Sequence, residues 1–139
     1  NRGIGYINRN DVLENKQWIE KYKILVPYAV GSGDSKTDLI KPIYAEPGTC
    51  CTETYLVIGA TNNSKEAMNI ISYIQTKFFH FTLTLKKNTQ HATKGAYEFV
   101  PIQNFDESWT DEKLYKKYNL TNDEIDYIET MIRPMEINK

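Results

Sequence analysis

The strongest constraint on the fold is a set of apolar residues at helical spacing near the middle of the chain. Ser64 is a suitable N-cap residue, and the apolar residues that follow it fall on one face of a helix that reaches about residue 78. These residues are Ala67, Ile70, Ile71, Ile74 and Phe78. The sequence therefore predicts one long amphipathic helix over about residues 64–78.

Strand patterns lie on both sides of this helix. Residues 52–58 (TETYLVI) alternate in polarity and are rich in β-branched and aromatic side chains, which is typical of a strand. Residues 23–30 (KILVPYAV) are apolar enough for a buried strand, but Pro27 cannot donate to a ladder, so we expect an edge or bulged strand. The alternation in residues 79–85 (FHFTLTL) favours another extended segment. Shorter extended segments are expected at 3–7, 39–45 and 97–100, turns at 46–48 and 60–63, and a polar connection at 11–22 with Trp18 and Ile19 turned inward.

The last third of the chain has helical signals and a different charge. Thr110 precedes two acidic residues and begins a short helix that ends near Tyr118. Thr121 and Glu124 have the spacing of a capping box, and the second helix that they begin is expected to end at about Arg133. Its apolar side is formed by Ile125, Ile128, Met131 and Ile132.

These elements predict a mixed α/β (α+β) fold. We expect a small, mixed, largely antiparallel sheet, the amphipathic helix over about 64–78 and a C-terminal helical pair. With 139 residues, 40% of them hydrophobic, the chain is long enough for one buried core and is not of disordered or collagen-like composition. We expect an α/β body over residues 1–104 and an acidic helical extension over 105–139, packed on the body or on a neighbouring domain. Because the chain begins with Asn rather than Met, we expect it to be part of a longer polypeptide.

The overall net charge of −1 hides an uneven distribution. Residues 1–104 carry a net charge of +3, and residues 105–139 carry −4. Residues 77–94 contain four lysines and two histidines but no acidic residue, so this segment is suited to a polyanion. A solvated lysine face is the structural alternative.

Several catalytic and metal-binding classes lack their motifs. Cys50 and Cys51 are adjacent, which disfavours a disulfide, so we expect reduced thiols packed as small apolar groups in a cytoplasmic protein. No run of apolar residues is long enough to cross a membrane, and no metal-ligand spacing surrounds either histidine. Residues 31–37 (GSGDSKT) do not have the glycine spacing of a P-loop. The short acidic and lysine patterns at 34–36 and 111–113 leave a metal-dependent nuclease as a minor alternative.

Residues 86–94 (KKNTQHATK) combine the side chains that recognise DNA. Lysine supplies phosphate contacts, and the amides of Asn and Gln match the hydrogen-bonding edge of adenine in the major groove. The small residues of the 31–37 loop allow close approach to a phosphate. The candidate DNA-binding residues are Ser32, Ser35, Lys36, Lys86, Lys87, Asn88, Gln90, His91 and Lys94. We expect no catalytic and no metal-binding residues.

Five stretches together resemble a known family. They are KILVPYAVGSGD at 23–34, PGTCCTETYLVIG at 47–59, YIQTKFFHF at 73–81, KNTQHAT at 87–93 and WTDEKLYKKY at 109–118. The chain is similar to the C-terminal target-recognition domain of bacterial restriction-modification enzymes with an adenine-specific DNA methyltransferase domain, the type IIG-like restriction enzymes. The resemblance implies sequence-specific recognition of double-stranded DNA, with the methyltransferase domain as a partner in cis and S-adenosylmethionine as the cofactor of the parent enzyme.

The catalytic residues of that family are missing from this chain. The Asn/Asp-Pro-Pro-Tyr/Phe tetrapeptide that holds the flipped adenine occurs nowhere in the sequence, nor does a glycine-rich loop for S-adenosylmethionine. We therefore expect no cofactor in this fragment and no catalysis by it, whereas the parent chain is expected to methylate DNA, with or without endonuclease activity. The main alternative is a protein-interaction or structural module of a larger enzyme.

Overall fold

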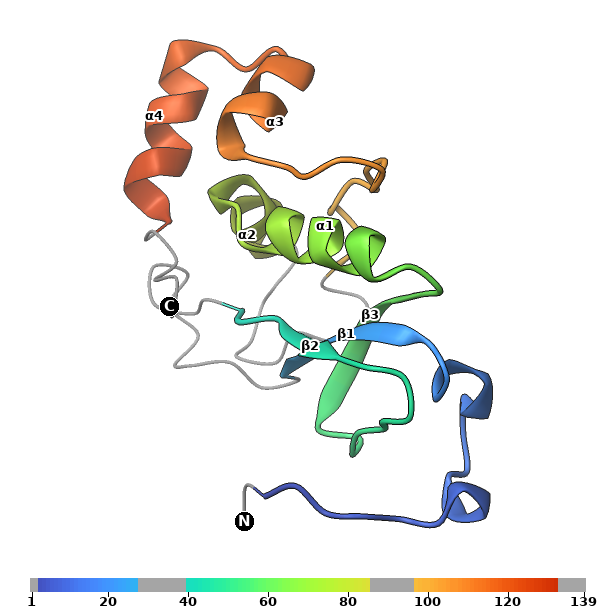
Figure 1. Cartoon of the computed structure of the whole chain (residues 1–139). Helices are drawn as coiled ribbons and strands as arrows, with labels where there is room; N and C mark the ends of the chain where they lie inside the picture. The colour runs from blue at the N-terminus through green and yellow to red at the C-terminus, as the bar shows by residue number, and fades with distance from the viewer. Residues whose placement is uncertain (1–2, 28–39, 86–96, 133–139) are drawn as a thin grey trace.

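A computed structural model describes residues 3–27, 40–85 and 97–132, and these form a small antiparallel sheet with four α-helices (Figure 1). The predicted mixed α/β fold is therefore confirmed. The strands are β1 (Tyr22–Pro27), β2 (Ile43–Ala45) and β3 (Tyr55–Thr61). The helices are α1 (Ser64–Ile74), α2 (Lys77–Thr84), α3 (Asp111–Lys117) and α4 (Asn122–Met131), and two short 3-10 turns, Arg9–Asp11 and Lys16–Trp18, precede β1.

The sheet has the order β2-β1-β3, and both pairs of strands are antiparallel. The prediction of a bulged strand around Pro27 is confirmed by a register shift between Ile24 and Leu25, whereas the alternative of an edge strand is wrong because β1 is central. Pro27 is tolerated because it is the last residue of β1. Ile24 and Val26 are fully buried, so the central strand supplies the floor of the core.

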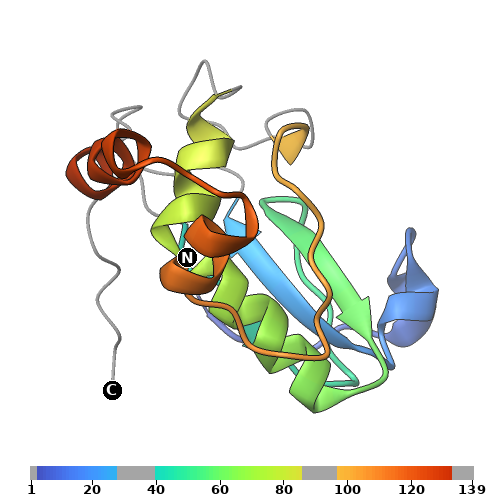
Figure 2. The same cartoon turned by 90° about the horizontal axis from the view of Figure 1, so that it is seen from above.

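The helices α1 and α2 lie between the sheet and the α3–α4 pair (Figure 1). Figure 2, seen from above, shows α3 and α4 lying over the helices α1 and α2. One apolar core joins these layers because buried residues of the sheet, α1 and α2 pack with those of α3 and α4. The contributions of the last third are Trp109, Leu114, Tyr115 and Ile128. A boundary between two units at residue 104 stays a prediction.

The expected helix over 64–78 is two helices, and the expected extended segment 79–85 is wrong. The helix α1 ends at Ile74, and Thr76 begins α2 as its N-cap, with its hydroxyl accepting from the Phe79 N–H (3.1 Å). Phe78 and Phe79 are both buried, because Phe79 packs against Tyr73 of α1 and Phe78 stacks on Tyr118 at the end of α3. A helix buried on several sides loses the single apolar stripe by which a helix is recognised.

Several other short segments differ between the sequence-based prediction and the structure. Residues 3–7 do not form a strand, and Ile4 and Tyr6 there are almost completely exposed, because none of the described strands pairs with this segment. Residues 97–100 form a tight turn rather than a strand, and β3 starts and ends three residues later than expected, so it replaces part of the predicted turn at 60–63. The N-cap of α1 is Asn63 rather than Ser64. The turn at 46–48 and the extended piece within 39–45 are confirmed.

The two C-terminal helices follow their capping signals. Thr110 caps α3, and the capping box of Thr121 and Glu124 begins α4. The predicted apolar side of α4 is confirmed at Ile128, which is buried in the same core cluster as Phe78 of α2 and Leu114 of α3. Tyr118 remains partly exposed and stacks on Phe78 with ring centroids 5.1 Å apart.

Candidate functional site

The predicted DNA-binding residues lie outside the residues that the structure describes. Ser32, Ser35 and Lys36 belong to the segment 28–39, and Lys86, Lys87, Asn88, Gln90, His91 and Lys94 belong to the segment 86–96. Their roles stay predictions. The structure does describe the residues that border both segments, and these define the candidate site.

Both segments return to the described fold at the same helix. Ile40, which follows the first segment, is fully buried, and its backbone N–H donates to Nε2 of His80 on α2 (3.0 Å). Tyr97, which follows the second segment, packs its ring against Phe79 of α2 with centroids 6.2 Å apart. The second segment also starts at α2, directly after its C-cap residue Leu85. The helix α2 therefore positions three of the four ends of the two predicted DNA-contacting segments.

His80 holds this junction as a structural residue. Its side chain is buried, Nε2 accepts from the Ile40 N–H, and Nδ1 lies 2.9 Å from the carbonyl oxygen of Thr76. A neutral imidazole has one donor and one acceptor, so this arrangement requires the tautomer with the proton on Nδ1. The sequence counted His80 within the basic segment 77–94, but in the fold it links α2 to the strand side of the molecule.

The N-terminus of α2 is anchored by the C-terminal third of the chain. The two carboxylate oxygens of Asp111 accept from the backbone N–H groups of Lys77 (3.1 Å) and Phe78 (2.9 Å). With the Thr76 hydroxyl bound to Phe79, the first three N–H groups of the helix have side-chain acceptors. Burial raises the pKa of Asp111, and the two backbone hydrogen bonds oppose this shift. This second capping residue was not recognised from the sequence because it lies more than thirty residues from the helix that it caps.

Lys77, the first lysine of the basic segment, has its charge paired within the molecule. Its ammonium group contacts the carboxylate of Glu129 on α4, and the other oxygen of Glu129 accepts from the Tyr115 hydroxyl (2.9 Å). The hydrogen bond from Lys77 lowers the pKa of Glu129, and the bond from Tyr115 acts in the same direction. Burial raises the pKa of Tyr115, with the charge of Asp111 adding to this effect. This network connects α2, α3 and α4.

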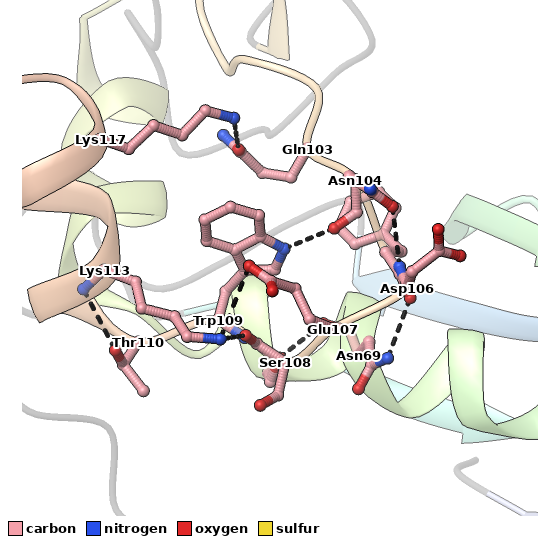
Figure 3. Close-up of polar contacts among 12 residues, drawn as sticks. Asn69, Gln103, Asn104, Asp106, Glu107, Ser108, Trp109, Thr110, Lys113 and Lys117 are labelled. Atoms are coloured by element: carbon pink, nitrogen blue, oxygen red, sulfur yellow. Dashed lines mark hydrogen bonds and ion pairs between the residues drawn. The ribbon is translucent and has the colours of Figure 1, made fainter.

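A second polar network holds the segment before α3 (Figure 3). The indole N–H of Trp109 donates to the Asn104 carbonyl (2.8 Å), and the ammonium groups of Lys113 and Lys117 lie 5.6 and 5.0 Å from the centroid of its ring. Lys117 also donates to the side-chain oxygen of Gln103 (2.6 Å). Trp109 is buried and belongs to the apolar core. This contact was not predicted from the sequence, although Lys113 and Lys117 are four residues apart and so lie on one face of α3.

One lysine of the body is buried instead of facing solvent. Lys23 on β1 donates through Nζ to the carbonyl oxygens of Ile19 (3.3 Å), Lys21 (2.9 Å) and Glu46 (3.4 Å). Burial lowers its pKa. Lys23 therefore closes the turn around the start of β1, and its charge is removed from the surface of the basic body.

The cysteines differ in part from the expectation. Both thiols are free, as predicted, but they are exposed rather than packed in the core. They lie between the 46–48 turn and the start of β3. Within the described ranges, no group of three or more His, Cys, Asp or Glu side chains is arranged to hold a metal ion.

Comparisons with models of protein families, with curated proteins and with solved structures find no match for this chain. Among the helices that the structure describes, none has the length and apolar character needed to span a bilayer.

Proposed function

We propose that this chain is a sequence-specific recognition domain for double-stranded DNA, acting in cis with the adenine-specific methyltransferase domain of a restriction-modification enzyme. The resemblance of five sequence stretches to such domains and the acid-free basic segment support this proposal. The structural observation that carries it is the attachment of both predicted DNA-contacting segments at α2, through Ile40 and Tyr97. Two segments that are fixed to the same helix are able to follow one duplex together.

The charge that remains for phosphate contacts is concentrated in the second segment. Lys77 pairs with Glu129, and His80 is buried, so the described part of the basic segment contributes little to a polyanion surface. Lys86, Lys87 and Lys94 then anchor the phosphates, and Asn88, Gln90 and His91 read base edges between them. Ser32, Ser35 and Lys36 of the first segment make the second set of backbone contacts. This division follows the general rule that phosphate contacts position a protein and base contacts give specificity.

The chemical step belongs to the rest of the parent enzyme in this proposal. S-adenosylmethionine supplies the methyl group there, and the role of the present chain is to place the target adenine before the catalytic domain. Whether the parent also cleaves DNA is a separate property of its other domains.

The first test is the salt dependence of DNA binding. A selection on randomised duplexes with the 139-residue chain first identifies a bound sequence. Replacement of Lys86, Lys87 and Lys94 by Ala should then weaken binding to every duplex and reduce the slope of log affinity against log salt by up to about 0.9 per lost phosphate contact. Fluorescence anisotropy at several salt concentrations measures both quantities.

A matched variant separates this effect from a general loss of positive charge. Replacement of Lys16, Lys65 and Lys116 by Ala removes the same charge from exposed positions that belong to neither segment. This control should leave the slope almost unchanged. If both triple variants behave alike, or if neither changes the affinity, the segment 86–94 is not the phosphate-binding surface.

A further inference from the structure

A shallow apolar groove lies between α2 and α4. Its volume is about 290 Å³. The two helices contact each other directly, and Figure 2 shows them on the same side of the molecule. The groove is lined by Phe78, Phe81 and Thr82 of α2 and by Leu120, Asp123, Glu124, Tyr127 and Ile128 of the α4 region.

The floor of this groove is part of the core, whereas its upper edge is open. Phe78 and Ile128 are buried. Tyr127 is 53% exposed and meets the half-buried ring of Phe81 edge to face, with centroids 5.8 Å apart. Two aromatic rings thus form one wall without cover from the described part of the chain. Exposed aromatic walls of this kind are typical of protein-binding sites.

The rim of the groove is acidic. Asp123 and Glu124 line it, and Asp126 lies on the same helix. Glu124 accepts hydrogen bonds from Thr121, but within the described residues none of these three carboxylates has a cation at ion-pair distance. Glu129, farther along α4, is already paired with Lys77. The groove therefore joins an apolar floor to carboxylates that pair with no cation of the described residues.

We propose that this groove docks a cationic amphipathic segment of a partner protein. One bulky apolar side chain of the partner enters between Phe81 and Tyr127, and Lys or Arg residues beside it pair with Asp123 and Glu124. The volume is at the lower end of the range for ligand pockets, which fits a single anchoring side chain. The acidic rim repels phosphate groups, so this surface is distinct from any DNA-contacting one.

Two synthetic helical peptides with the same leucine pattern test this proposal. One carries lysine at its polar positions and the other carries glutamate, and titration calorimetry measures their binding to the full 139-residue chain. We expect the leucine-lysine peptide to bind at least tenfold more tightly, with an affinity that falls as salt is added.

Variants at the rim and wall assign the binding to the groove. Tyr127→Ala should weaken binding of the leucine-lysine peptide by about tenfold, the factor expected for loss of an interface aromatic side chain. Asp123→Lys should reduce the preference for lysine over glutamate. The matched controls are Leu13→Ala, an exposed apolar residue outside the groove, and Asp106→Asn, an exposed acid outside it. Neither control should change the affinity, and thermal melting checks that every variant is folded.

Three results would overturn the proposal. These are absence of binding by the leucine-lysine peptide, equal binding of both peptides, and an unchanged affinity in folded Tyr127→Ala. A fourth concerns the chain itself: if a chain that ends at Ile132 binds the peptide much more tightly than the full chain, the terminal residues 133–139 occupy the groove and no separate partner is required. None of these results depends on the lysines proposed to bind DNA.

Discussion

At the scale of single residues, Asp111 has the largest structural influence that the sequence did not reveal. Its carboxylate accepts from two N–H groups at the start of α2 and so joins α3 to that helix. We expect Asp111→Ala to lower the free energy of unfolding by about 1 kcal/mol, a value typical of lost helix caps, because the relief of carboxylate desolvation offsets part of the loss. Asp111→Asn keeps one acceptor and should lose less.

Urea denaturation of both variants measures these differences, with Glu112→Ala as the neighbouring control. Glu112 is exposed and makes no described hydrogen bond to α2. If Asp111→Ala is no less stable than Glu112→Ala, the cap contributes nothing to stability.

Glu129 gives a second residue-scale prediction, on pH. Contact with Lys77 lowers the pKa of Glu129 below its ordinary value of 4.5, so the folded state holds this proton less tightly than the unfolded state. The resulting stabilisation is complete above the unfolded pKa and is lost as the pH falls through the folded one. We expect Glu129→Gln to be less stable than the parent chain by about 0.5–1 kcal/mol near neutral pH, because the pair is partly exposed. That difference should disappear in acid.

Thermal melting over a series of pH values tests this expectation. Asp126→Asn is the control on the same helix, because Asp126 has no cation partner in the described residues. A stability difference for Glu129→Gln that is the same at neutral and acidic pH would contradict the assigned role of the ion pair.

At the scale of elements, the contact between β3 and α1 is set by a glycine. A Cβ atom at Gly59 would lie 2.9 Å from Cδ1 of Ile70. Because that atom is the end of a flexible side chain, we expect Gly59→Ala to cost only about 1 kcal/mol, at the low end for overpacking. Ile70→Val removes the clashing methyl group, so the double variant should be more stable than the sum of the two single effects predicts. A double-mutant cycle by urea denaturation measures this coupling, and strict additivity would contradict the proposed contact.

The same scale shows why sequence predicted some elements and not others. α3, α4 and the start of β1 were predictable because their signals are local: Thr110, the Thr121 capping box and a continuous apolar run. α2 was not, because Phe78 and Phe79 are buried on different sides and the carboxylate at its start comes from Asp111. The groove between α2 and α4 was not predictable from the sequence either. The apolar side of α4 was visible in the sequence, but Phe81 covers it only in part, and the position of Phe81 depends on the path of α2.

At the scale of the whole molecule, the C-terminal third is part of the single described core. Deletion of residues 105–139 removes Trp109, Leu114, Tyr115 and Ile128 from that core and takes away Tyr118, on which the ring of Phe78 stacks. We expect the shortened chain to aggregate or to melt at a much lower temperature, because the loss of several large buried side chains costs a few kcal/mol each. Differential scanning fluorimetry and size-exclusion chromatography measure these effects.

A chain that ends at Ile132 is the matched control, because it keeps every described core residue. It should melt at nearly the temperature of the full chain. If the chain without residues 105–139 stays folded and soluble but no longer binds DNA, the C-terminal helices belong to the DNA-reading surface instead of the core.

The contact of Asp111 with the start of α2 can form only after the ribosome has synthesised residue 111, well after α2 itself. Lys77 and Asp111 are 34 residues apart, so at roughly 5–20 residues per second about 2–7 s pass between their additions to the chain. Two described side chains cap α2, and during this interval only one of them, Thr76, has been synthesised. The aromatic side chains of α2 that later pack against α3 and α4 are still uncovered. We expect a nascent chain at this stage to be a substrate for chaperones, and pauses in translation after α2 to prolong that exposure. Synthesis of the last third supplies the α3 and α4 side chains that complete the core.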